Sequence, residues 1–252
     1  PFTAAQPFFG IPPPHGSPAV APNPRRLRRF RTNTWVVRSG EERRLETGEQ
    51  YGFGQYERGH RLNRPEQPVV RISWEQASAF CRWLSAQTGK RFSLPTEEQW
   101  EYASRAGTRT DLWYGGLDTD FSAYANLSDA THYTVDHPHV PTALPPWRPP
   151  DPRFDDHWRV SAPVGTFKPN HWGLCDMHGN VAEWTASDYR DPTGLHQPGT
   201  NHKVVRGGSW MDRPRRARLA FRLHYAASQP VHDVGFRVVC VDPNGSSECS
   251  RP

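Results

Sequence analysis

The sequence has very little lysine and no long apolar run, and each shortage excludes a class of protein. Only Lys90, Lys168 and Lys203 are lysines, so the net charge of +5 over 252 residues comes almost entirely from arginine. A charge of this size makes a modest field, and we expect no nucleic-acid partner. No apolar run approaches the ~20 residues that cross a bilayer. We therefore expect membrane association only through a partner, or through an anchor removed upstream of Pro1.

Cysteine is also scarce, and the histidines are poorly spaced for a metal. The four cysteines form no CxxC pair, which argues against a zinc ribbon; they are Cys81, Cys175, Cys240 and Cys249. No HExxH motif is present, and the one tight histidine pair, His137 and His139, has a proline between its members. The sequence predicts no zinc or iron site.

Proline and glycine are abundant, at 26 and 20 residues, and predict much irregular structure. Residues 1–33 are rich in proline and arginine and predict an extended arm, which four phenylalanines make adhesive. We expect one globular domain over residues 34–243 and a tail over residues 244–252.

Two helices follow from capping boxes. Ser73 with Gln76 predicts a helix that ends at Gly89, and Thr96 with Gln99 predicts a helix that ends at Gly107. Helical spacing predicts that one face of each helix is buried; the inward residues are Trp74, Ala77, Phe80, Cys81, Leu84, Trp100, Tyr102 and Ala103. Strands are expected at 69–72, 204–206 and 234–241. Residues 108–170 are expected to form a long loop rich in aromatic residues. A loop of this length in a compact domain usually has a function or is held in place by other contacts.

The densest chemistry lies in GLCDMHGNVAEW, residues 173–184. Gly173 and Gly179 permit tight backbone conformations, and three side chains supply hard oxygens at close spacing: Asp176, Asn180 and Glu183. The apolar members anchor the loop in a core; they are Leu174, Met177, Val181 and Trp184. Such a set could hold Ca²⁺, but spacing alone favours a buried hairpin whose polar groups cap turns.

This motif resembles the signature of the formylglycine-generating enzyme (sulfatase-modifying factor) family. Two further blocks, 68–103 and 205–239, resemble that family in the same order. The resemblance implies an α+β, C-type-lectin-like fold with little regular secondary structure, a twisted antiparallel sheet and two core helices. It covers residues 65–240, and the family's opening block is not recognisable upstream.

The resemblance also implies one or two structural calcium ions. The first would be held by Asn126, Leu127, Asp156 and Trp158, and the second by Asp176, Gly179, Val181 and Glu183. The alternative at each place is a turn held by Asx hydrogen bonds. The resemblance further suggests a Cys81–Cys240 disulfide, although two buried free thiols are the favoured interpretation.

The catalytic cysteine pair of the family is missing. Its two copper-binding positions fall at Asp212 and Ala217, and neither residue can replace a thiolate that binds Cu(I). No copper is expected, and formylglycine generation is disfavoured. Relatives that act in siderophore maturation and thiol-imidazole synthesis also lack the pair, so Ser209, Asp212 and Arg213 stay weak catalytic candidates.

An arginine-rich segment surrounds these positions. Arg206, Arg222 and Arg237 are expected to make structural contacts with carboxylates such as Asp233, while Arg213, Arg215 and Arg216 are expected to be exposed. The alternative is an anion or acidic-protein site over the old cleft.

The function expected from the sequence is a non-catalytic binding or accessory subunit, extracytoplasmic (periplasmic or secreted), in a larger assembly. Its N-terminal arm and aromatic loops would hold a protein partner. Two alternatives remain: a divergent oxidoreductase of the same family, and a lectin-like binder of an acidic ligand or glycan.

Overall fold

The computed structural model describes residues 35–38, 41–44, 56–57, 60–62, 64, 66–133, 149–191 and 201–241. The expected N-terminal arm and C-terminal tail lie outside the described residues. Within them, no helix is both long and apolar enough to cross a bilayer.

Both predicted helices are confirmed. Helix α2 spans Trp74–Thr88, and helix α3 spans Glu97–Arg105. Each begins with a reciprocal capping box, Ser73 with Gln76 and Thr96 with Gln99, which satisfies two orphan backbone donors at each N-terminus. Gly89 ends α2 in the left-handed conformation, whereas α3 ends at Ala106, one residue before the predicted Gly107.

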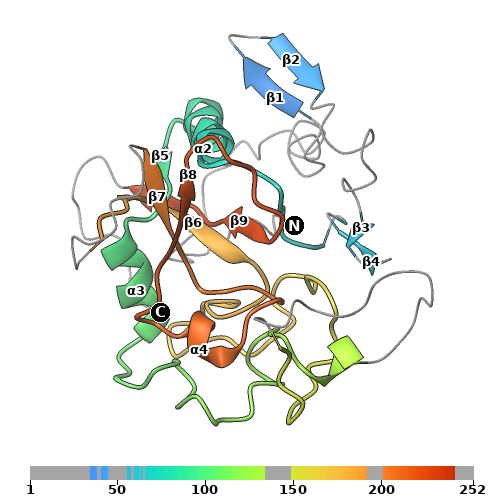
Figure 1. Ribbon diagram of the computed structural model, residues 1–252. Coiled ribbons are helices and arrows are strands. Elements are labelled where there is room, and N and C mark those ends of the chain that lie inside the picture. The colour runs from blue at the N-terminus through green and yellow to red at the C-terminus, as the bar shows by residue number, and fades with distance from the viewer. Residues whose placement is uncertain are drawn as a thin grey trace, which may run out of the picture.

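The central sheet has four strands in the order β8-β7-β6-β9. The strands are β6 Ala182–Asp188, β7 His202–Arg206, β8 Leu223–Ala226 and β9 Val234–Phe236. Strands β6, β7 and β8 pair antiparallel, but β6 and β9 run parallel. The sheet is therefore mixed rather than purely antiparallel, and it lies at the middle of the molecule (Figure 1).

Three two-stranded ribbons complete the sheets of the described chain. Strand β1 Trp35–Arg38 pairs with β2 Glu41–Arg44, β3 Tyr56–Glu57 with β4 His60–Arg61, and β5 Arg91–Ser93 with β10 Val239–Val241. The strand predicted over 234–241 is thus two strands in different sheets, β9 and β10. Residues 69–72 form no strand; Ile72 makes a single bridge to Val231, and Arg71 has a positive φ of 61°.

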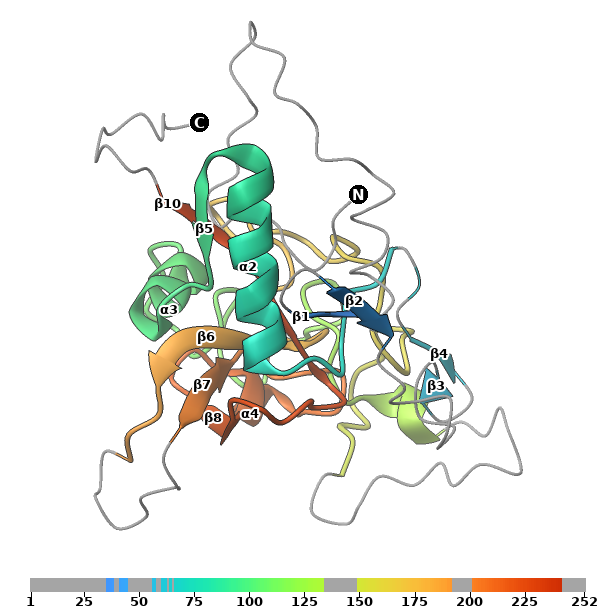
Figure 2. The same ribbon diagram turned by 90° about the horizontal axis from the view of Figure 1, so that it is seen from above.

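Helix α2 packs on one face of the central sheet, beside the β5–β10 ribbon (Figure 2). Its buried residues meet Trp184 of β6, Val205 of β7 and Phe236 of β9 in the main core cluster. The long segment 108–170 is irregular where described, apart from a 3₁₀ turn at Ala130–Tyr133. The prediction that Tyr102 faces inward is wrong, because its side chain is 64% exposed on α3.

Candidate functional site

The motif 173–184 joins three core clusters, which explains its central place in the fold. Leu174 and Met177 pack with Trp100 in one cluster, Val181 packs with Trp210 in another, and Trp184 lies in the main core. All four predicted apolar anchors are buried.

Gly179 lets two distant segments touch. Its φ is +68°, and a Cβ at this position would lie 2.1 Å from the backbone oxygen of Asn126. The next residue, Asn180, donates its backbone N–H to that same oxygen at 2.8 Å. The Asn180 side chain also exchanges hydrogen bonds with the backbone of Ala162. The motif therefore fixes the long loop at both Asn126 and Ala162.

The first copper position of the family is filled by a buried, hydrogen-bonded carboxylate. Asp212 is 1% exposed, and its Oδ2 accepts hydrogen bonds from the Ser209 backbone N–H at 3.1 Å and lies 3.2 Å from Ser209 Oγ. Ser209 Oγ also lies 2.7 Å from Oδ2 of Asp233. The other oxygen of Asp212 lies 3.1 Å from Nε of Arg216. Two of the weak catalytic candidates, Ser209 and Asp212, are thus brought together, but they are buried.

The second copper position is closed by packing. Ala217 is fully buried, and a Cβ on Gly208 would come 3.0 Å from its Cα. The Ala217 carbonyl accepts the Nδ1–H of His178 at 2.7 Å, while Nε2 of the same ring accepts the Trp113 backbone N–H at 3.1 Å. These two bonds define one neutral tautomer. Burial lowers the pKa of His178 to about 4.

Arg213, the third weak candidate, donates to the Pro150 carbonyl. Of the three arginines predicted to be exposed, only Arg215 is; Arg213 and Arg216 are half-buried, because they bind the Pro150 carbonyl and Asp212. The prediction of structural roles for three arginines agrees with the geometry, in which Glu97, Glu101 and Glu183 are carboxylate partners. Arg237 forms a fork with Glu183, with N···O distances of 2.6 and 2.7 Å.

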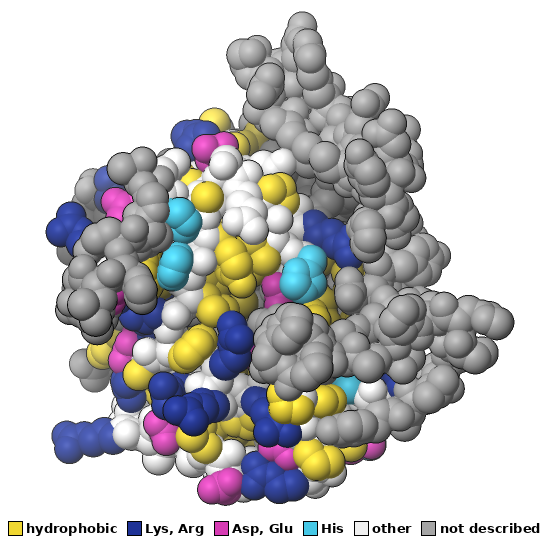
Figure 3. Space-filling model, viewed as in Figure 1, with side chains coloured by type: hydrophobic (Ala, Val, Ile, Leu, Met, Phe, Trp, Pro, Cys, Tyr) yellow, Lys and Arg dark blue, Asp and Glu magenta, His cyan; other side chains and the backbone are white. Residues whose placement is uncertain are grey.

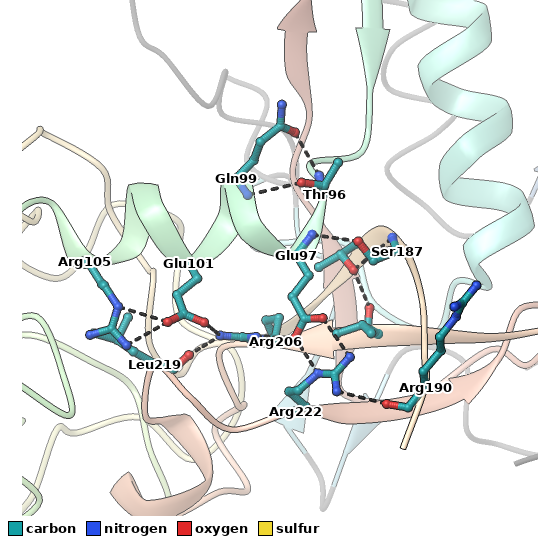
Figure 4. A network of polar contacts seen from close by, with 12 residues as sticks. Thr96, Glu97, Gln99, Glu101, Arg105, Ser187, Arg190, Arg206, Leu219 and Arg222 are labelled. Atoms are coloured by element: carbon teal, nitrogen blue, oxygen red, sulfur yellow. Dashed lines mark hydrogen bonds and ion pairs between the residues drawn. The ribbon is translucent and has the colours of Figure 1, made fainter. Parts of the chain in front are cut away.

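Arg206 and Arg222 hold α3 against the strands (Figure 4). Arg206, with a side chain 1% exposed, pairs with Glu97 and with Glu101, the latter at 2.7 Å. Arg222 binds both oxygens of Glu97, at 2.6 and 2.8 Å. Arg206, which immediately precedes Gly207 and Gly208, therefore has a structural role.

The first calcium set fits a hard cation. Oδ1 of Asn126 is buried and has no hydrogen-bond partner. Asp156 is 3% exposed, and burial, followed by the neighbouring Asp129 carboxylate, raises its pKa to about 9. Each oxygen of Asp156 accepts one backbone N–H at 2.8 Å, from Leu127 and from Trp158, so three of the four predicted residues meet here, and Asn126 precedes Leu127 in the chain. The orphan oxygen of Asn126 and the two crowded carboxyls of Asp129 and Asp156 are hard donors of the kind that Ca²⁺ prefers.

The second calcium set fits a cation less well. Asp176 has one buried oxygen without a partner, and burial raises its pKa to about 6. The carboxylate of Glu183, however, is already neutralised by Arg237 and accepts the indole N–H of Trp100 at 2.7 Å. Within the described residues, no three His, Cys, Asp or Glu side chains gather as a metal site.

Sequence reasoning missed two residues of these sites. Asp129 is fully buried; burial opposes its ionisation, but His132 and Thr131 outweigh that effect and lower its pKa. Its position three residues after Asn126 was the available signal. His178 lies inside the motif, but nothing in the spacing tied it to Ala217, 39 residues later.

Cys81 is a free, buried thiol, so the favoured interpretation without a Cys81–Cys240 bridge agrees with the structure. Cys240 is exposed rather than buried. It pairs with Phe92 across the short β5–β10 ribbon. Burial raises the pKa of the Cys81 thiol to about 12, which makes it a packing residue.

Comparison with known proteins agrees with this geometry. The family model of the sulfatase-modifying factor enzyme 1-like domain matches residues 30–241, and the chain belongs to that family. The fold is also that of the family: the solved structure of PvdO from Pseudomonas aeruginosa superposes with a TM-score of 0.57 and 26% identity, covering 82% of this chain and 70% of that one.

The relatives within the family differ in activity, as their names state. A formylglycine-generating enzyme from Streptomyces coelicolor is 35% identical over 188 residues, covering 69% of this chain and 52% of that protein. The inactive Cα-formylglycine-generating enzyme 2 of Mus musculus is 33% identical over 181 residues, covering 68% of this chain and 48% of that protein. The chain spans about half the length of these relatives.

Proposed function

We propose that this chain is a non-catalytic member of the family that serves as a binding or accessory subunit of a larger protein assembly. The observation that carries the proposal is the state of the two copper positions. One holds the buried Asp212, whose carboxylate is bonded to Ser209 and Arg216, and the other holds the buried Ala217.

The chemistry of these residues disfavours the family's oxidation. Cu(I) is a soft ion that selects thiolate or thioether ligands, whereas a carboxylate is hard and an alanine methyl has no ligand atom. Met211 is the nearest soft donor in the sequence, and its sulfur already contacts Nε2 of His232 at 2.9 Å. A single thioether does not replace a dithiolate.

An exposed aromatic pair, one ring of which lies on α3, offers a surface for a partner. The exposed large apolar side chains of the described chain are Tyr102, at 64%, and Trp172, at 41%. Their rings form an edge-to-face pair with centroids 4.9 Å apart. Exposed Tyr and Trp side chains are favoured at protein interfaces, because they bury much area with few rotatable bonds. We take this pair as the aromatic part of the docking surface, and the N-terminal arm as its companion.

The proposal extends to calcium and to compartment. Asn126, Leu127, Asp156 and Trp158 would hold one structural Ca²⁺, with Asp176, Gly179, Val181 and Glu183 as a weaker second set. An extracytoplasmic location, periplasmic or secreted, would supply calcium at a useful concentration. The inactive relative named above supports the non-catalytic role.

The test separates the proposed role from its alternatives. The protein, loaded with copper and supplied with oxygen, is incubated with a cysteine peptide from a sulfatase, and the peptide mass is followed. We expect no conversion, and we expect the native protein to migrate in a complex larger than itself. Conversion of the peptide would establish a divergent oxidoreductase. So would copper or iron at unit stoichiometry in the protein as isolated, before copper is added. Glycan binding that is lost with a chelator would establish the lectin-like alternative.

A matched pair of variants tests the docking surface. Trp172→Ala combined with Tyr102→Ala is expected to release the partner from the complex, while Gln87→Ala, also exposed but on α2, keeps it. If both variants retained the partner equally, the interface would have to lie elsewhere on the protein.

A further inference from the structure

One segment of the surface carries an unusual density of arginine. Helix α4, Pro214–Ala217, is a single turn that follows the old copper position. Four arginines lie on it and beside it within six residues: Arg213, Arg215, Arg216 and Arg218. Lys and Arg side chains gather over the lower part of the molecule, where α4 lies, with Asp and Glu side chains among them (Figure 3).

Half of this charge forms no ion pair with a carboxylate among the described residues. Arg216 pairs with Asp212 at 3.1 Å. Arg213 donates to the Pro150 carbonyl, and its charge helps to lower the pKa of the neighbouring Asp151, which Arg153 also binds. Arg218 contacts the ring of Phe221, and Arg215 is exposed. The cluster is therefore a net cationic surface, in contrast to Arg206 and Arg222, whose charges are balanced by Glu97 and Glu101.

The cluster is also held in place before any ligand arrives. The guanidinium carbons of Arg216 and Arg218 lie 5.5 and 6.0 Å from the ring centroid of Phe221, within the range of a cation–π contact. Pro214 at the first helical position fixes the local backbone. Side chains that are ordered beforehand lose less entropy on binding.

The surroundings favour a compact acidic ligand over an extended polyanion. Asp111 is exposed, and its carbonyl accepts the backbone N–H of Leu219, directly after the cluster. Next to Pro150, Arg153 binds the buried Asp151 and the exposed Asp118, with N···O distances of 2.8 Å. These carboxylates limit the length of the cationic surface, so a short run of Asp or Glu can contact the arginines without passing them, whereas a long phosphate backbone cannot. Arginine forks match carboxylates in a bidentate geometry.

We propose that Arg213, Arg215 and Arg218 form a docking site for a short acidic segment of a partner protein. The site uses the exposed Arg215 of α4 and the half-buried Arg213 and Arg218 on either side of it, rather than the buried Asp212 and Ala217. It is independent of the aromatic pair Tyr102 and Trp172, so either surface can fail its test without the other.

The experiment measures binding of a labelled oligo-glutamate peptide by fluorescence anisotropy at low and at physiological salt. Combined Arg213→Gln, Arg215→Gln and Arg218→Gln are expected to weaken binding about tenfold, since three exposed ion pairs of ordinary strength account for that much. The control combines Arg82→Gln, Arg91→Gln and Arg109→Gln, three exposed arginines elsewhere, and removes the same charge. It should change affinity by less than about threefold, because distant exposed charges are screened.

Equal losses in the two triple variants, or no peptide binding at all, would overturn the proposal. A DNA oligonucleotide that binds more tightly than the peptide, in a manner dependent on the α4 arginines, would also overturn it in favour of a nucleic acid. Thermal melting checks that the variants fold. Should the triple variant unfold, Arg215→Glu alone, at an exposed position, must still reduce peptide binding several-fold for the proposal to stand.

Discussion

At the residue scale, the most constrained position is Gly179. It combines a left-handed backbone with close contact to the Asn126 carbonyl, and its neighbours carry the motif's polar groups. Gly165 provides a natural comparison, because its φ of +77° is similar while a Cβ there would meet nothing within 4 Å.

Gly179→Ala should therefore cost much more stability than Gly165→Ala. The left-handed backbone alone costs a non-glycine residue about 1–2 kcal/mol, and we expect that loss for Gly165→Ala. The added clash with backbone at Gly179 should raise the loss to about 4 kcal/mol or more, at the level of severe core mutations. Urea unfolding of both variants measures the difference; equal losses would show that the backbone shifts freely at Asn126.

His178 sets a second prediction, on acid stability. Its pKa is about 4 in the folded protein, because burial disfavours the charged ring, against an ordinary value of 6.5. Between these values the unfolded chain binds a proton that the folded protein does not, so stability falls as pH falls from 6.5 to 4. The integrated effect is about 3 kcal/mol, at 1.36 kcal/mol for each pKa unit.

The measurement compares the pH dependence of unfolding free energy in the wild type and in His178→Gln. The amide can keep one donor and one acceptor but does not titrate. We expect the variant to be less stable at pH 7 and to have a shallower slope between pH 6.5 and 4. Parallel slopes would mean that other groups carry the acid response.

At the scale of elements, one carboxylate of α3 binds two arginines, one at the end of β7 and one directly before β8. Glu97 receives both Arg206 and Arg222 (Figure 4). The Arg206 side chain is 1% exposed, so loss of its partner leaves a buried charge that is only partly compensated by Glu101.

Glu97→Gln is expected to destabilise the protein by about 3 kcal/mol, in the range for breaking one side of a buried ion pair. Glu98→Gln, the exposed neighbour on the same helix turn, should change stability by less than about 0.5 kcal/mol, as surface substitutions do. Chemical denaturation gives both values. A small effect at Glu97 would show that Glu101 alone balances Arg206.

At the scale of the whole molecule, the proposed calcium ion would join segments that are far apart in the chain. The first set comes from residues 126–127 and 156–158, and Asn126 in turn meets the central motif through Asn180. An ion bound only by the folded state stabilises that state by ligand linkage. Excess EDTA should therefore lower the melting temperature, and added Ca²⁺ should restore it.

The pH dependence of this effect follows from Asp156. Its folded pKa of about 9 lies above the ordinary value of 3.8, so without calcium this group stabilises the fold at low pH, and that contribution is lost as pH rises toward 9. Calcium would compete with the proton, so the gap in melting temperature between calcium and EDTA should widen from pH 6 to pH 9. Asp129→Asn should narrow this gap in melting temperature, while Asp118→Asn, at an exposed position, should leave the gap unchanged. An unchanged melting curve in EDTA at every pH would remove the calcium proposal.

The sequence by itself determined the local features whose causes are local. Capping boxes at Ser73 and Thr96 defined both helix starts, because the bonds that make them join residues three apart. The family motif predicted the fold, and the resemblance predicted that Asp212 and Ala217 stand where the family has its two copper-binding cysteines. The tertiary structure alone decided what depends on segments distant in sequence. It divides residues 234–241 between two sheets and leaves Tyr102 exposed to solvent. It also pairs Glu183 with Arg237 and places the Asp129 carboxylate next to that of Asp156. Hydrogen bonds, burial and pKa shifts of this kind arise from atoms that folding brings together, so the spacing of residues along the chain does not predict them.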